Sequence, residues 1–285
     1  MKIPFRRVCA VFFSPTGSTA KMTEYLAECI AKKADVRIER FEYTLPKGRQ
    51  KAIHFRKDDL VVLGSPVYAG RTPNRMLPFL ESVTGEETPV VLLAMYGNRS
   101  YGDALTELRN VTEANGFIPV AAAAMIGSHP MSRVLGTGAM GAGRPNAADM
   151  EKAGAFAGRV YELLCEKGLP EERLFVPGND PVGPYYRPLG EAGEPVNFLK
   201  AKPLTNDSCT ACGDCVKCCP EGAINRDDPH VVSGICIKCM ACVEICKEHA
   251  KYFTDENLLS HSRYLEAAFA GEQKEAEFYG LWDQI

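Results

Sequence analysis

The sequence predicts two folded parts: an α/β domain on a doubly wound parallel sheet, and a smaller cysteine-rich α+β domain. In residues 1–167, short β-branched runs alternate with longer amphipathic segments, which is the rhythm of parallel strands joined by crossover helices. Nine of the 12 cysteines lie between Cys209 and Cys246. A chain of 285 residues with 46% hydrophobic content is long enough for two domains, each with its own core.

Five strands are expected in the first part, with helices in the gaps between them. The first helix carries Met22, Leu26 and Ile30 on one face. Residues 73–83 form a weaker helix pattern, because Pro78 would strain a helix interior. A doubly wound sheet places its ligand site at the carboxyl ends of the strands. The five predicted strands span residues 7–13, 36–41, 59–64, 89–96 and 117–126.

The rest of the chain divides into three segments. Residues 168–203 are rich in proline and carry aromatic side chains, which predicts a linker that packs across the first domain rather than a free tether. Residues 204–250 form the cysteine-rich domain. Residues 251–285 resume a helical pattern and are expected to form a helical docking tail.

Charge and hydropathy argue against nucleic-acid binding and against a membrane span. The formal net charge is −3, and Lys and Arg are scattered, so the chain lacks the basic field on which nucleic-acid binding depends. The apolar run at 8–13 is too short to span a bilayer, and no cleavage site follows it. We therefore expect a cytoplasmic protein with no membrane span and no nucleic-acid partner.

The cysteine spacing is the most specific signal in the chain. Residues 209–220 read CTACGDCVKCCP and residues 236–246 read CIKCMACVEIC, so CxxCxxCxxxC occurs twice. Three thiolates at such intervals wrap a loop around one corner of an iron-sulfur cubane after another, and a more distant fourth closes the site. Structural zinc is the alternative, but it needs four ligands and commonly uses two separate pairs. The pattern predicts two [4Fe-4S] clusters.

The repeated motif resembles that of bacterial two-cluster ferredoxins. Their fourth cysteine ligates the other cluster, so the resemblance implies crosswise ligation. Cys218 is an extra thiol, and the spacing together with Pro220 favours its neighbour as the ligand. Lys247 departs from the pattern, since a second proline is usual there. The implied ligands are Cys209, Cys212, Cys215 and Cys246 for the first cluster, and Cys236, Cys239, Cys242 and Cys219 for the second.

A hydroxyl-rich loop follows the first predicted strand. Residues 14–19 read SPTGST and lead into a helix, where hydroxyls and free amides make a phosphate site. The loop lacks the GK[ST] of a Walker A motif, so an NTPase is not expected. Two tyrosine-bearing loops, 64–73 and 95–103, follow the third and fourth strands and belong to the same edge of the sheet.

With these three loops the first domain resembles the flavodoxin family, and the whole chain resembles the fused flavodoxin and ferredoxin iron-sulfur flavoproteins of anaerobes. The resemblance implies strand order 2-1-3-4-5 and one FMN, with Tyr68 and Tyr101 against the isoalloxazine and nearby backbone groups at its polar edge. The phosphate would be held by Ser14, Thr16, Gly17, Ser18 and Thr19, and the ring by Pro66, Val67, Tyr68, Ala69, Gly70, Tyr96, Gly97, Asn98, Tyr101 and Gly102.

Residues 136–141 read GTGAMG, a literal dinucleotide-binding fingerprint in the wrong context. The run does not directly follow a strand, and Pro145 interrupts before the next helix. We expect a mobile glycine-rich loop near the flavin instead, from which His129, Arg133 or Arg144 would face a substrate.

Three functions remain open at this point. The first is an electron relay between two [4Fe-4S] clusters and FMN, whose partners are redox proteins or a small-molecule electron acceptor. The second is an FMN-dependent reductase of a small substrate, fed by its own ferredoxin domain, which an open pocket over the flavin would favour. The third is a redox-sensing module without turnover, which cofactors buried away from one another would favour.

Overall fold

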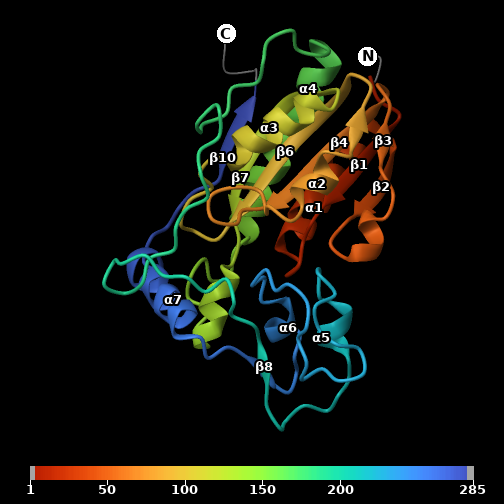
Figure 1. The fold of residues 1–285 in the computed structure, drawn as a ribbon. Coiled ribbons are helices and arrows are strands. Elements are labelled where there is room, and N and C mark those ends of the chain that lie inside the picture. The colour runs from red at the N-terminus through yellow and green to blue at the C-terminus, as the bar shows by residue number, and fades with distance from the viewer. Residues whose placement is uncertain (1–3, 281–285) are drawn as a thin grey trace.

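The computed structural model describes residues 4–280 and shows two bodies (Figure 1). The upper body is a sheet with helices on both faces, and the lower body holds the nine cysteines between Cys209 and Cys246. Within residues 4–280, none of the helices is both long and apolar enough to cross a membrane.

The upper body is built on five parallel strands whose order confirms the prediction. The order β2-β1-β4-β6-β7 is the 2-1-3-4-5 order of flavodoxin-like doubly wound sheets. The central strands are buried along their whole length, as expected where helices cover both faces. The strands are β1 (Arg7–Phe12), β2 (Arg37–Glu42), β4 (Asp59–Pro66), β6 (Thr88–Tyr96) and β7 (Phe117–Ile126).

The sheet has a sixth strand that the sequence did not predict. β10 (Glu277–Gly280) pairs antiparallel with β7, with Tyr279 opposite Ala122. We expected five strands and a helical docking tail. The strand count is wrong, since the sheet has six strands, whereas the tail does contain a helix, α7 (Glu256–Phe269), ahead of this strand. The strand has four residues, too few for a periodicity signal, and it covers an edge of β7 that would otherwise be open to pairing.

Helices cover the two faces of the sheet in pairs. α1 (Ser18–Ala34) and α4 (Ala147–Glu166) share one core cluster with the sheet. α3 (Ala104–Ala114) and the short α2 (Leu77–Leu80), with Pro78 in its first turn, pack on the other face. The smaller elements are the 3-10 helix η1 (Pro46–Arg49) and the two-residue strands β3 (His54–Phe55) and β5 (Thr84–Gly85).

Residues 168–203 lie against the upper body. Leu174 and Val176 are buried in the core on the α3 face. The Asp103 carboxylate accepts backbone N–H groups of Asn179 and Gly183, each at 2.8 Å. These contacts hold the segment on the sheet domain before it reaches the lower body.

The lower body contains few regular elements. It packs on the upper body through the 3-10 helix η2 (Pro130–Leu135), where Met131 and Val134 contact a small core that includes Met240 and Leu258. Its elements are β8 (Leu204–Thr205), β9 (Lys251–Tyr252), α5 (Asp214–Lys217), α6 (Ala241–Glu244) and the longer α7 (Glu256–Phe269), which lies beside η2 in Figure 1.

The segment after β7 contributes to the contact between the two bodies. Met140 is fully buried, and its carbonyl accepts the His129 amide at 2.9 Å. Arg133 pairs with Glu244 at 3.1 Å. Arg144 pairs with the Asp149 carboxylate. Of the three side chains considered for a substrate, two are thus engaged in ion pairs.

Candidate functional site

A cavity of about 570 Å³ lies at the carboxyl edge of the sheet, within the size range of cofactor sites. Residues from the loops at the ends of β1, β4, β6 and β7 line it. It therefore lies where a doubly wound sheet binds its ligand. The predicted site residues that line it are Thr16, Ser18, Thr19, Pro66, Val67, Tyr68, Ala69, Tyr96 and Gly97.

The hydroxyl loop has the geometry of an anion site. Gly17 has a φ of +88°, and a Cβ there would meet nothing within 4 Å, so the loop opens on free space where α1 begins. Ser14 faces inward instead: its Oγ accepts the Ala20 amide at 2.9 Å. A Cβ on Gly64 would lie 1.9 Å from Thr23 Oγ1, so only glycine lets α1 approach β4 this closely. The amides and hydroxyls at this helix N-terminus fit a phosphate.

Tyr68 sits on a tightly anchored turn. Its backbone N–H and C=O pair with those of Arg71 at 2.8 and 3.1 Å. The Arg71 guanidinium pairs with the buried Glu107 carboxylate, which also accepts the Thr72 amide at 2.9 Å. Burial raises the pKa of Tyr68 well above its ordinary value, and the nearby Cys239 raises it further. The ring of Tyr68 is thus held between the sheet edge and the cysteine-rich body.

Four of the residues suggested for the flavin ring do not line the cavity: Gly70, Asn98, Tyr101 and Gly102. The Tyr101 hydroxyl bonds to Glu277 and Tyr279, each at 2.8 Å, so β10 holds this ring away from the cavity. The Asn98 side chain donates to the carbonyls of Phe269 and Glu272, both at 2.9 Å, and fastens the chain after α7. Both side chains have structural partners in the tail that follows the cysteine-rich domain.

Several residues that line the cavity were missed by the sequence reasoning. Some lie in the loops after β4, β6 and β7, and the others come from the proline-rich segment and from α7, which approach the sheet edge only in the folded chain. The aromatic content of the linker was the only signal that pointed to it. The missed residues include Asn74, Arg75, Met95, Arg99, Gly127, Ser128, Tyr185, Tyr186, Phe198, Leu199 and His261.

Two histidines that line the cavity, His129 and His261, are neutral. Burial, together with the nearby His261 and Arg99, lowers the pKa of His129 to about 4. His129 Nδ1 accepts the Met131 amide at 3.1 Å, so the proton of the neutral ring lies on Nε2. Burial also lowers the pKa of His261, whose Nδ1 donates to the Leu189 carbonyl at 2.8 Å. Both rings therefore keep Nε2 free, as a donor in His129 and as an acceptor in His261.

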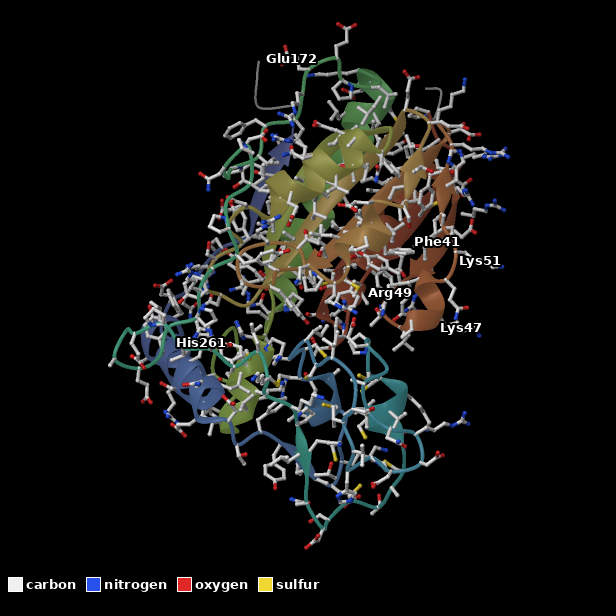
Figure 2. All side chains as sticks on the ribbon, viewed as in Figure 1. Phe41, Lys47, Arg49, Lys51, Glu172 and His261 are labelled. Carbon is white, nitrogen blue, oxygen red and sulfur yellow. The ribbon has the colours of Figure 1, made fainter. Side chains whose placement is uncertain are left out.

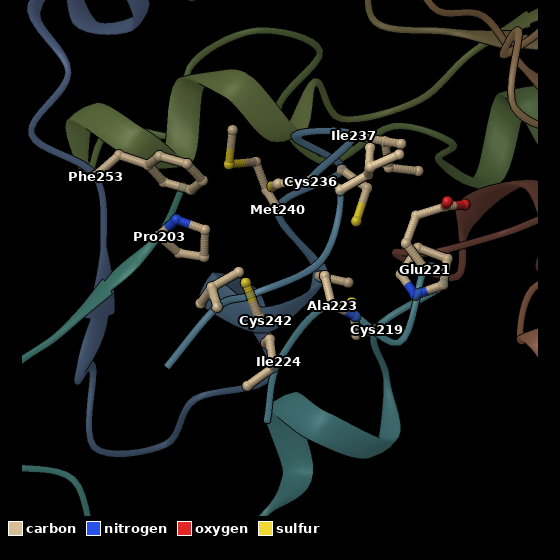
Figure 3. A pocket seen from close by; sticks show the side chains of 15 residues that line it. Pro203, Cys219, Glu221, Ala223, Ile224, Cys236, Ile237, Met240, Cys242 and Phe253 are labelled. Atoms are coloured by element: carbon tan, nitrogen blue, oxygen red, sulfur yellow. Dashed lines mark hydrogen bonds between the residues drawn. The ribbon is translucent and has the colours of Figure 1, made fainter. Parts of the chain in front are cut away.

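The lower body contains two further cavities, and each is lined by one of the predicted cysteine quartets. Figure 3 shows Cys219, Cys236 and Cys242 around the smaller one, of about 20 Å³. The larger, of about 140 Å³, also has Asp214 and Lys251 in its wall. The first quartet, Cys209, Cys212, Cys215 and Cys246, lines the larger cavity, and the second quartet, Cys219, Cys236, Cys239 and Cys242, lines the smaller.

The fourth cysteine of each run has the same local geometry. The Ala223 amide donates to Cys219 Sγ at 3.3 Å, and the Ala250 amide donates to Cys246 Sγ at 3.2 Å. Amides that bond to thiolate sulfur are typical of cluster sites. Cys218 lines neither cavity, and its thiol bonds to the Cys215 carbonyl at 3.5 Å. Across residues 4–280, no group of His, Cys, Asp or Glu is arranged to hold a single metal ion.

No protein-family model matches the chain, and no curated protein matches it. Solved structures are similar to part of it. Oxidised flavodoxin 1 from Bacillus cereus is 17% identical with a TM-score of 0.41, and the match covers 55% of this chain and 97% of that one. A flavodoxin from the domain Archaea is 12% identical, with a TM-score of 0.39 and coverages of 56% and 99%. An NADH:FMN oxidoreductase in its apo form is 17% identical, with a TM-score of 0.40 and coverages of 59% and 91%. At this level of similarity the functions of those proteins do not transfer to this chain.

The cavity at the sheet edge and the smaller cysteine cavity share a wall. Ile235, Cys236, Ile237 and Cys239 line both of them. Arg49, labelled in Figure 2 where the upper body faces the cysteines, donates to the Pro220 carbonyl at 2.5 Å. The two sites are thus neighbours across one short stretch of chain.

Proposed function

We propose that the protein is an electron-transfer iron-sulfur flavoprotein that relays electrons between two [4Fe-4S] clusters and FMN. The observation that carries this proposal is the shared wall, because Cys236 and Cys239 line both the smaller cysteine cavity and the cavity at the sheet edge. Clusters carry single electrons and FMN accepts one or two, so together they would couple one-electron to two-electron chemistry.

Each group of residues would have one role in this relay. The α1 N-terminus with Thr16, Ser18 and Thr19 would bind the FMN phosphate, and Tyr68 would pack against the ring. The two quartets would hold the clusters crosswise. Cysteine thiolates are the usual ligands of such clusters, so the quartets have the donor chemistry that iron would require.

The first test is composition. Protein purified without oxygen should contain one FMN, eight irons and eight sulfides per chain. A preparation with zinc and no sulfide would contradict the cluster assignment, and one with FAD or no flavin would contradict the FMN assignment.

The second test is electron flow in the intact chain. A low-potential donor protein should bleach the clusters before it reduces the flavin in stopped-flow measurements without oxygen. Cys239→Ser should slow flavin reduction, whereas Cys218→Ser, the same change at a thiol outside both cavities, should behave as wild type. Equal flavin reduction rates in all three proteins would show that the second quartet is not part of the path.

A second candidate is an FMN-dependent reductase of a small substrate. It is favoured by the extent of the cavity, which continues past the strand-edge loops to Tyr186, Phe198 and His261. Steady oxidation of the reduced protein by a small acceptor, faster than that by free FMN at equal concentration, would support the reductase. If the reduced protein is oxidised by every acceptor no faster than free FMN is, the reductase is contradicted and the relay remains as the proposed function.

A further inference from the structure

The far wall of the flavin cavity is basic and aromatic, and it contains no acidic residue. Among all the described residues that line the cavity there is no Asp and no Glu, while Arg75, Arg99 and Lys238 are present. Such an imbalance in a partly buried site favours a negatively charged ligand.

Two of these three cations already have partners. Arg75 pairs with Glu221 at 3.0 Å. The Lys238 ammonium donates to the carbonyls of Cys236, at 2.9 Å, and of Leu199. Neither has its full charge available for a ligand.

Arg99 is different. Its guanidinium stacks over the Tyr186 ring, 3.9 Å from the centroid, and within residues 4–280 it has no carboxylate partner and donates no hydrogen bond. Burial lowers the pKa of Arg99, but an arginine keeps its charge at any physiological pH. Arg99 is half-buried, and a cation whose partner among residues 4–280 is an aromatic ring keeps its charge available to attract an anion.

The surroundings of Arg99 indicate what kind of anion fits. Phe198 stacks on His261 with ring centroids 5.5 Å apart, and Leu265 from α7 adds an apolar side chain. The free Nε2–H of His129 is a neutral donor on the same wall. The wall therefore combines one planar cationic fork, one neutral donor and apolar surface, which suits a planar carboxylate on an apolar body.

We propose that Arg99, His129, Tyr186, Phe198, His261 and Leu265 form a subsite for a small apolar carboxylate beside the flavin. A ligand of this kind that also carries a group reducible by a flavin would be a substrate of the reductase described above, and to that extent the inference rests on the proposed function. The binding itself does not depend on turnover.

The test is calorimetric titration of the full-length protein, as purified, with benzoate and with its neutral isostere benzamide. Benzoate should bind at least about tenfold more tightly, because benzamide cannot form a charge-assisted pair with a guanidinium. Arg99→Met should abolish this difference. Arg133→Met, which removes a cation of the same kind outside the cavity, should preserve it. Both variants should retain the FMN content of wild type.

Equal binding of the two probes to wild type, or binding of neither, would overturn the inference. So would an Arg99→Met protein that loses FMN while retaining benzoate binding, since Arg99 would then serve the flavin. Protein without flavin would instead refute the proposed function, and the same titration would still decide the subsite because calorimetry needs no chromophore.

Discussion

The turn that carries Tyr68 depends on one buried ion pair, between Arg71 and Glu107. The Glu107 side chain is 5% exposed, and that of Arg71 is 17% exposed. Arg71 also donates to the Gly183 carbonyl at 3.0 Å and lies 4.5 Å from the centroid of the Tyr185 ring. Arg71→Met leaves the carboxylate buried with the Thr72 amide as its remaining donor, so we expect the free energy of unfolding to fall by about 3–5 kcal/mol. Glu107→Gln keeps an acceptor for that amide and should cost less, about 1.5–3 kcal/mol.

Urea unfolding followed by circular dichroism measures these losses, and fluorescence titration with FMN measures the effect on the site. Both variants should bind FMN more weakly. The ion pair between Arg71 and Glu107 fixes the turn, and the backbone of Arg71 in this turn holds that of Tyr68. Arg173→Met is the matched control, because this arginine pairs with Glu113 at the surface and should contribute at most about 1 kcal/mol. The reasoning is refuted if Arg71→Met is no more destabilising than the control, or if FMN affinity does not change.

Three further predictions concern the cofactor sites and pH. Cys219→Ser should lower the iron content while Cys218→Ser leaves it intact; equal losses would contradict the assignment of Cys219 as the ligand. Flavin-free protein should bind FMN more tightly than riboflavin, and Thr16→Ala with Thr19→Ala should reduce the difference; an unchanged difference would place the phosphate elsewhere. His129 has a folded pKa of about 4 against 6.5 in the unfolded chain, so the unfolded state takes up its proton first as pH falls. About 2 kcal/mol of unfolding free energy present at pH 7 should be lost by pH 5, and His129→Gln should flatten this slope in urea unfolding; an identical slope would show that this ring is not the cause.

The sequence predicted what local patterns encode, and it failed where distant segments meet. Strand order follows from alternating apolar runs, because parallel strands with crossovers have few arrangements. The grouping of the cysteines into two quartets follows from the CxxCxxC spacing, because that spacing places three cysteines on one loop around one site. Tyr101 was misplaced because its partners, Glu277 and Tyr279, lie on a strand too short to be recognised. Arg99 gave no local signal either, since its environment is assembled from the linker and α7.

The return of the chain from α7 to β10 changes what kind of attachment the cysteine-rich body has. It is attached to the sheet domain at both ends, as an inserted domain is. Leu174 and Val176 fix the chain before it, and β10 fixes the chain after it. A segment attached at both ends has less freedom to move away from the sheet domain than one attached at a single end. The distance between its cysteines and the sheet edge is therefore set by the fold rather than by the reach of a linker.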